Sequence, residues 1–323
     1  MMILFNIFLI ISLNPNFYNY VPGEWVGGNG FSASPASSGN VHVNPALADT
    51  VDCLSVNFRL FADGYTTTDG GFSSASFNIP VFLGFVMGGN FNILYDCNMK
   101  AYSVLGGSTN NNYHNNFARK GGIYCLGGYI AKPLGVLSLG MDVNILNGKS
   151  DDIWKIQFEG KHYYDVDDTV RTLFRGYSVG MGFNLNIANF SLGGYFCPYQ
   201  EVKKQYYDEE EEEFELDAPL RFGINYYLNE DKGAMFSIDR REAFIGFNYS
   251  FVKLGYSRMY SMGTGFDVNA NRFLGGVSFS VSGLPLSVTL ENRRYLGKFS
   301  DNQFIANIGI SISGKGRTNE DKF

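Results

Sequence analysis

The feature that most constrains this chain is an alternation of apolar and polar residues with a period of two, recurring between residues 51 and 313. In the clearest stretch the apolar residues are Tyr177, Val179, Met181, Phe183, Leu185 and Ile187. A period of two is that of a β-strand whose two faces differ. The intervening residues are only Ser, Gly and Asn, which are too small and too polar to fill a packed core. An apolar exterior around a polar interior is the arrangement of a transmembrane β-barrel.

The composition of the chain argues against a helical membrane protein and against a nucleic-acid-binding protein. The chain has 39 Gly, 29 Phe and 21 Tyr, and beyond its N-terminus it contains no apolar run long enough for a spanning helix. A net charge of -6 argues against nucleic-acid binding, because no basic stripe is available to neutralise phosphates. A soluble β-sandwich remains an alternative, but it would bury the apolar faces and expose Gly, Ser and Asn on many strands.

The pattern predicts an all-β fold, a 14-stranded antiparallel transmembrane β-barrel with a small N-terminal luminal plug. The expected strands are 52–62, 75–87, 89–102, 122–132, 135–146, 173–187, 189–200, 216–228, 233–240, 242–250, 252–261, 271–282, 285–295 and 303–313. Their connections alternate between tight turns, such as one at Gly88, and mostly longer polar loops. Short turns on one rim and long loops on the other are typical of outer-membrane barrels. Pro80 falls inside an expected strand and predicts a bulge, because proline cannot donate to the sheet.

The chain divides into a signal segment at 1–12, a plug at 13–50, the barrel at 51–314 and a polar tail at 315–323. The first segment resembles the apolar core of a secretory signal, although Arg59 is the first basic residue. A barrel of this kind predicts export to the outer membrane of a Gram-negative-type bacterium, where it contacts outer-membrane lipid.

Charged residues on the polar face should point into the lumen. The mixture of signs predicts a network across the lumen, which would partly close the pore; ordinary solvated lumen charges are the alternative. The expected lumen-facing charges are Arg59, Asp96, Lys100, Asp142, Arg221 and Glu291.

The chain resembles the FadL superfamily of outer-membrane barrels, in particular its PorV/PorQ-like branch. A Gly-rich stretch at 27–33 and the Asn44, Pro45 and Ala46 motif directly before the first strand carry this resemblance. The segments 217–223 and 243–257 resemble the PorV/PorQ branch. The resemblance implies that Asn44, Pro45 and Ala46 form the plug motif.

The two branches imply different functions. PorV/PorQ-like barrels are accessories of type IX secretion, so the first expectation is binding of secreted or envelope proteins. The alternative is FadL-like passive transport of hydrophobic molecules such as long-chain fatty acids. A structural or adhesive surface barrel is a third possibility, since the long loops share one rim.

No catalytic site, cofactor or resident metal is expected. The only histidines are His42, His114 and His162, and neither a nucleophile elbow nor a zinc motif accompanies them. The acidic run at 208–217 predicts a solvated loop, with binding of a hard cation such as Ca²⁺ as the alternative. The thiols of Cys53, Cys97, Cys125 and Cys197 are expected to be unpaired, since each falls on a different expected strand.

Overall fold

The computed structural model describes residues 26–27, 30–31, 44–50, 55–64, 68–96, 99–105, 113–158, 165–207, 209–214, 218–229, 232–239, 242–259, 269–281, 284–296 and 302–313. Side chains are not described for 55–75 and 302–313, nor for most of 93–119 and of 280–295. None of the described helices is long and apolar enough to cross a membrane.

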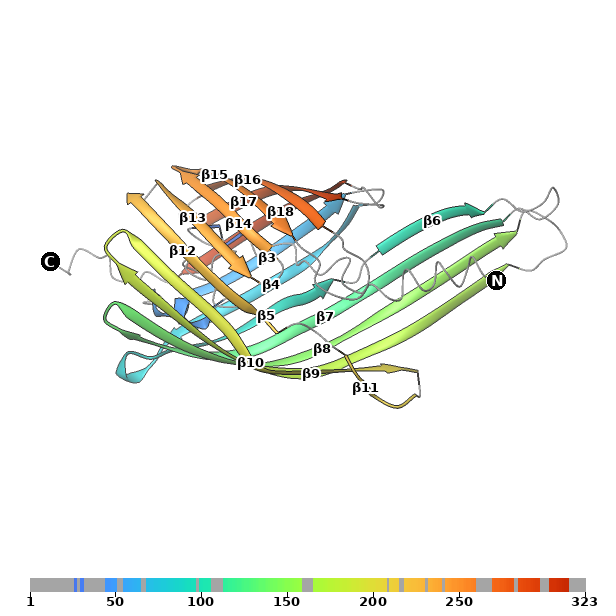
Figure 1. The fold of residues 1–323 in the computed structure, drawn as a ribbon, viewed down its shortest axis with the longest axis horizontal. Helices are drawn as coiled ribbons and strands as arrows, with labels where there is room; N and C mark the ends of the chain where they lie inside the picture. The colour runs from blue at the N-terminus through green and yellow to red at the C-terminus, as the bar shows by residue number, and fades with distance from the viewer. Residues whose placement is uncertain are drawn as a thin grey trace.

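The described strands form an antiparallel sheet that closes on itself, because the last strand pairs with the first strand of the sheet (Figure 1). Of the sixteen strands in this sheet, β6 (Met99–Leu105) continues the line of β5, and β11 (Glu212–Glu213) is a short addition beside β10. The other strands form the ring in chain order: β3 (Ser55–Gly64), β4 (Thr68–Pro80), β5 (Val86–Asp96), β7 (Tyr113–Leu134), β8 (Leu137–Phe158), β9 (Val166–Ile187), β10 (Phe190–Tyr206), β12 (Leu220–Asn229), β13 (Lys232–Asp239), β14 (Glu242–Tyr249), β15 (Val252–Met259), β16 (Asn269–Val281), β17 (Leu284–Leu296) and β18 (Asn302–Ser313). The predicted antiparallel β-barrel is confirmed.

Burial along β8 confirms that the apolar face is the outer one. Leu139, Met141, Val143 and Ile145 are 45–62% exposed, whereas the Ser, Gly, Asp and Asn residues between them are buried. A water-soluble protein would bury the first set. The same inversion continues on β9 and β10, so these three strands present an apolar belt to their surroundings.

The two ends of the barrel differ. One end carries two-residue turns at 135–136, 188–189 and 250–251, and the other carries the longer connections. The predicted turn at Gly88 is wrong, because the chain turns at 81–85 through the short helix η3 (Phe82–Gly84), where Leu83 has a φ of 61°. The predicted bulge at Pro80 is also wrong. Pro80 is the last residue of β4, where a missing N–H donor disrupts the sheet least.

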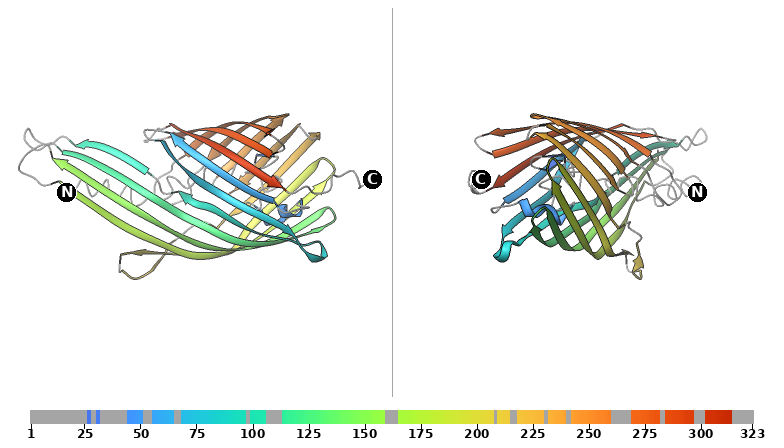
Figure 2. Two further views of the ribbon diagram at one scale, coloured as in Figure 1. Left: turned by 180° about the vertical axis from the view of Figure 1, so that it is seen from behind. Right: turned by 60° about the vertical axis from the view of Figure 1, so that its left-hand side comes forward.

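Strands β7 to β9 reach far beyond the rest of the barrel at the long-loop end (Figures 1 and 2). The sequence predicted loops there, because the apolar alternation stops. Cross-strand ion pairs accompany the extension. Arg171 Nε donates to Asp151 at 2.6 Å, and Lys155 lies 2.9 Å from Asp167. The Arg171 guanidinium holds the pKa of Asp151 below its usual range.

The register of β5 changes at Leu94, where Ile93 pairs with Tyr124 but Tyr95 pairs with Ile123. A bulge of this kind reverses the phase of the alternation beyond it. The expected uninterrupted strand at 89–102 is therefore wrong, since a bulge at 94 interrupts its register.

Candidate functional site

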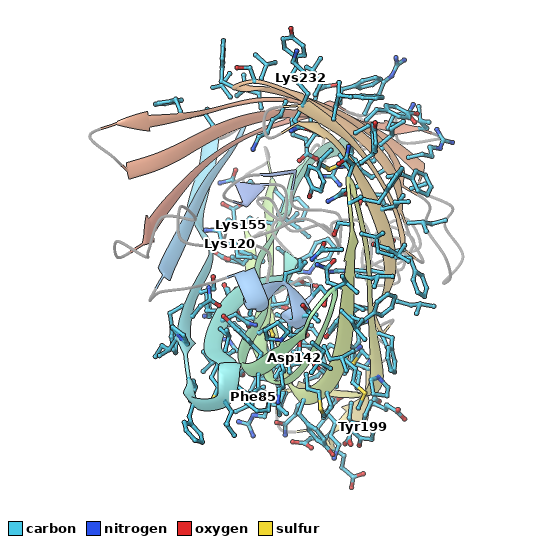
Figure 3. The ribbon with its side chains drawn as sticks, turned by 90° about the vertical axis from the view of Figure 1, so that its left-hand side faces the viewer. Phe85, Lys120, Asp142, Lys155, Tyr199 and Lys232 are labelled. Carbon is cyan, nitrogen blue, oxygen red and sulfur yellow. The ribbon has the colours of Figure 1, made fainter. Side chains whose placement is uncertain are left out.

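Within the predicted plug, a short segment inside the barrel is described, which we call the luminal segment (residues 44–50); its side chains are described for 44–48. It comprises Asn44 and the 3-10 helix η2 (Pro45–Thr50), and Figure 3 shows it in blue within the ring of strands. Asn44, Ala46 and Ala48 are 0% exposed and Leu47 is 1% exposed. The segment packs against β7, β8 and β9, so it occupies one side of the lumen.

The Asn44 side chain holds this segment in two ways. Its Nδ2 donates to the Phe183 carbonyl of β9 at 2.9 Å. Its Oδ1 accepts from the Ala46 N–H at 3.1 Å, while its carbonyl accepts from the Leu47 N–H at 3.1 Å. The Oδ1 contact is a helix-capping bond of the kind that asparagine forms well. One amide therefore both starts η2 and ties it to the barrel wall.

Two glycines make the close approach possible. Gly140 of β8 and Gly182 of β9 are paired across the strands. A Cβ at Gly140 would overlap the Pro45–Ala46 backbone, and one at Gly182 would overlap Asn44 Oδ1. The wall is therefore bare of side chains where the luminal segment rests on it.

On the β7 side, Ala48 packs with Val86, Tyr129 and Ala131. The Tyr129 hydroxyl is hydrogen-bonded to the Asn78 side chain and lies 2.8 Å from the Phe77 carbonyl, both on β4. Tyr129 therefore connects the residues that pack against the luminal segment to β4.

A second cluster, in the inner wall beside the luminal segment, contains two of the predicted lumen charges. Asp142 is 3% exposed, and the Tyr195 hydroxyl lies 3.3 and 3.2 Å from its two carboxylate oxygens. Arg221 pairs with Tyr195 across the strands and interacts electrostatically with Asp142. Asp142 points into the barrel (Figure 3).

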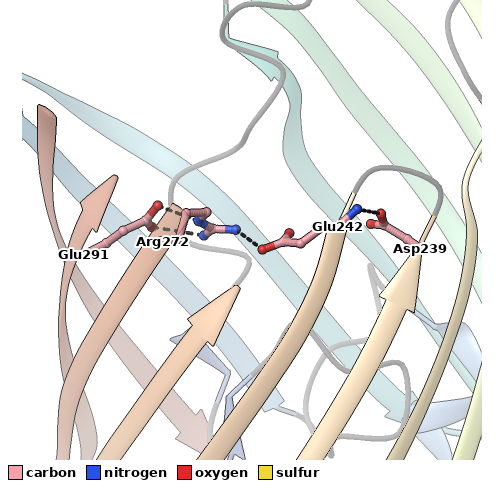
Figure 4. A network of polar contacts seen from close by, with 4 residues as sticks. All are labelled: Asp239, Glu242, Arg272 and Glu291. Atoms are coloured by element: carbon pink, nitrogen blue, oxygen red, sulfur yellow. Dashed lines mark hydrogen bonds and ion pairs between the residues drawn. The ribbon is translucent and has the colours of Figure 1, made fainter. Parts of the chain in front are cut away.

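A third cluster contains Glu291, which lies toward the long-loop end. Arg272 Nε and Nη2 donate to Glu291 at 2.7 and 3.1 Å, and its Nη1 donates to Glu242 at 2.7 Å (Figure 4). The Glu242 N–H donates to Asp239 Oδ1 at 2.6 Å. The side chains of Arg272 and Glu291 are 0% exposed, so this ion network is buried inside the barrel.

The remaining predicted charges cannot be placed with these clusters. Arg59, Asp96 and Lys100 lie on β3, β5 and β6, but their side chains lie outside the described residues. The predicted lumen charges with described side chains fall into two separate groups, Asp142 with Arg221 and Glu291 with Arg272. Sequence reasoning missed Arg272, Glu242 and Tyr195, although the luminal phase of the alternation on β16 and β10 could have indicated the first and last.

Farther toward the long-loop end, the inner wall carries an apolar patch. Its members are Ile123, Cys125, Leu146, Phe174 and Val202, with the half-buried Phe214 packed against them. Phe214 comes from the connection after β10; its N–H donates to the Val202 carbonyl at 2.8 Å, and its ring lies 5.2 Å from that of Phe174. Leu146 lies six residues beyond Gly140 on β8, which is about 20 Å along the strand.

The cysteine and acidic residues show no reactive or metal-binding arrangement among the described residues. Cys125 and Cys197 are buried free thiols, as predicted, whereas Cys53 and Cys97 lie outside the described residues. No group of three potential metal ligands occurs within the described ranges. Glu209 to Glu213 are exposed, and Glu212 lies 3.2 Å from Lys204.

The histidines cannot be assessed as catalytic groups. His42 and His162 are outside the described residues, and only the backbone of His114 is described.

Solved structures with the same architecture identify the fold. The CymD monoaromatic hydrocarbon channel matches with a TM-score of 0.58 at 11% identity, over 90% of this chain and 98% of that chain. The toluene transporter TodX of Pseudomonas putida matches with 0.56 at 11% identity, and a FadL homologue of Pseudomonas aeruginosa with 0.53 at 12% identity; each covers 92% of this chain and 98% of the other.

The fold is that of a FadL-type outer-membrane β-barrel. No protein-family model matches the chain, and no curated protein matches its sequence. The PorV/PorQ branch is not among the three structures above, so that part of the resemblance stays a prediction.

Proposed function

We propose that this protein is a passive outer-membrane channel for hydrophobic molecules. The observation that carries the proposal is the apolar patch around Leu146 and Phe174 on the inner wall of the barrel, where neighbouring inward residues such as Asn144 and Ser178 are polar. Ligand sites for apolar molecules are lined mainly by apolar and aromatic side chains such as these. Its position between the long-loop end and the luminal segment suits a molecule that enters from outside and is held before it passes.

The chemistry required is binding and release, without a covalent step. The patch is buried, with Leu146 2% and Phe174 6% exposed, and Phe214 packs against it from a connection between strands, so a ligand would bind there by displacing Phe214. The fold shared with hydrocarbon channels supports the proposal at the level of architecture. The chain's own residues would then set which hydrophobic molecules pass.

Uptake in cells tests this function. The barrel is expressed in a host that lacks its own hydrophobic-compound channels, and entry of radiolabelled toluene and oleate is measured. We expect uptake above the empty host, and a several-fold loss in Leu146→Asn, because an unpaired amide in the patch costs about 1–3 kcal/mol of binding. Leu134→Asn is the matched control, since Leu134 is 51% exposed at the short-turn end.

A protein-binding role as a type IX secretion accessory predicts a different result. Crosslinking in source cells would then recover secreted proteins that share a C-terminal domain, and the barrel would give no uptake above the empty host. That pair of results would replace the transport proposal. Uptake together with recovery of the barrel alone would sustain it.

A further inference from the structure

The outer surface of β8, β9 and β10 changes from apolar to charged within two residues. The pairings align these strands in rows, which are Val143–Val179–Tyr199, then Ile145–Tyr177–Glu201, then Asn147–Arg175–Lys203. Apart from Glu201, the first two rows complete the apolar belt, and the third begins the charged surface toward the long-loop end.

Tyrosines mark this boundary. The rings of Tyr177 and Tyr199 stack with centroids 5.3 Å apart, and Tyr199 lies on the outer surface (Figure 3). Their hydroxyls donate to Glu201 at 3.1 and 2.7 Å. Tyrosines with an apolar ring and a polar tip gather where hydrocarbon meets the headgroup layer. The row of Arg175 and Lys203 therefore begins at headgroup height, about 7 Å farther along the strands than the preceding row.

The charges in that row are incompletely compensated. Arg175 and Lys203 are directly opposite each other on paired strands, an arrangement that is unfavourable for like charges. Among the described residues Arg175 has no ion pair, and Lys203 has two long ones, 3.5 Å to Glu201 and 3.9 Å to Glu211. Lys149 lies diagonally across from Arg175 on β8 and is 55% exposed, with Asp151 at 3.4 Å.

We propose that Arg175, Lys203 and Lys149 bind the phosphate groups of an anionic glycolipid in the outer leaflet of the outer membrane. An arginine fork and two ammonium groups suit a phosphate, which accepts several charge-assisted hydrogen bonds. A phosphate between Arg175 and Lys203 also removes their mutual repulsion. The site is continuous with the apolar belt, so the acyl chains of the same lipid would lie against Val143, Val179 and Ile145.

The proposal requires that the long-loop end faces outward, as in outer-membrane barrels generally. It does not depend on which molecule the lumen carries.

Lipid binding to the purified full-length protein tests the site. The detergent-solubilised barrel is titrated with diphosphorylated lipid A and with its dephosphorylated form, and bound lipid is counted by native mass spectrometry. We expect the phosphorylated lipid to bind and Arg175→Ser/Lys203→Ser to weaken it about tenfold or more. Lys155→Ser is the matched control. Lys155 is as exposed as Lys149, at 55%, but it lies farther from the apolar belt and pairs with Asp167.

Each outcome has a defined meaning. Equal binding of both lipid forms, or of the wild type and the double variant, would overturn the proposal. So would loss of binding in EDTA with no effect of the double variant, since the acidic stretch at 209–213 would then be acting through a divalent cation. Displacement of the lipid by equimolar inorganic phosphate would show that the row binds phosphate without selecting a lipid, and would also overturn it. A heat-dependent mobility shift on gels shows that each variant is folded.

Discussion

At the scale of single residues, the absence of side chains matters as much as their presence. Gly140 and Gly182 leave the wall bare, and Asn44 fills the space above Gly182 with an amide that bonds to the Phe183 carbonyl. The luminal segment is thus held against the wall by shape and by the hydrogen bond from Asn44 Nδ2 to the Phe183 carbonyl. Its attachment should respond sharply to the addition of one methyl group.

Gly182→Ala should loosen the luminal segment, because the new methyl group would overlap Asn44 Oδ1. Overpacking of this kind costs about 1–3 kcal/mol, and displacement of the segment should raise single-channel conductance in planar bilayers. Gly275→Ala is the control, since no heavy atom lies within 4 Å of its added Cβ. Equal conductance and thermal stability in the two variants would mean that the segment is not held at Gly182.

At the scale of elements, the Arg272 network joins three strands that are not all neighbours. Arg272 of β16 bonds to Glu291 on the adjacent β17 and to Glu242 on β14, across the intervening β15. Arg272→Met would leave two buried carboxylates without their partner, which costs about 3–5 kcal/mol. Urea unfolding from lipid vesicles should report that loss.

The matched comparisons separate charge from packing. Arg294→Met changes an exposed arginine on β17 and should have little effect. Combining Arg272→Met with Glu242→Gln and Glu291→Gln should recover most of the lost stability, because the uncompensated charges are gone. If the triple variant is as unstable as Arg272→Met alone, the network stabilises the barrel through packing of the arginine and not through charge.

The barrel itself follows from sequence because membrane strands carry a strict pattern. Residues 177–187 alternate without exception, so their strand and their outward face are predictable. The outer extensions are not. Beyond Ile145 on β8 the outward residues are Asn147, Lys149 and Asp151, which lie outside the apolar belt, and hairpin pairing between Asp151 and Arg171 replaces the hydrophobic pattern. A bulge such as the one at Leu94 leaves no signature in composition either.

The candidate site could be predicted only in part, because its contacts depend on how the strands pair. The sequence places Asp142 and Glu291 on the luminal face by alternation, but it cannot give the strand pairing that brings Tyr195 to Asp142 or Arg272 to Glu291. Those contacts join residues 53 and 19 positions apart. The motif at Asn44 is visible in the sequence, whereas the glycines that receive it are indistinguishable from many others until β8 and β9 are paired.

At the scale of the whole molecule, the inverted burial fixes how the barrel sits in its membrane. On β8 the outward side chains are apolar up to Ile145 and then become Asn147 and Lys149. The same change occurs in the same row on β9, where Tyr177 is followed by Arg175. Two strands thus agree on one level for the outer boundary of the hydrocarbon layer.

Arginine substitutions along the outer face of β8 measure that boundary. Val143→Arg places a guanidinium inside the apolar belt and should destabilise the barrel; at the midplane such a change costs about 2–4 kcal/mol, and near the interface about 0–1 kcal/mol. Asn147→Arg, two rows farther out, should therefore cost little. Reversible unfolding in lipid vesicles gives both values on one strand and one face. Equal costs of about 2–4 kcal/mol in both variants would put the basic row of Arg175 and Lys203 inside the hydrocarbon, where it could not meet headgroup phosphates. A much larger cost for Val143→Arg than for Asn147→Arg places the row of Arg175 and Lys203 at the headgroups. There, an arginine and a lysine facing each other gain most from an anion between them.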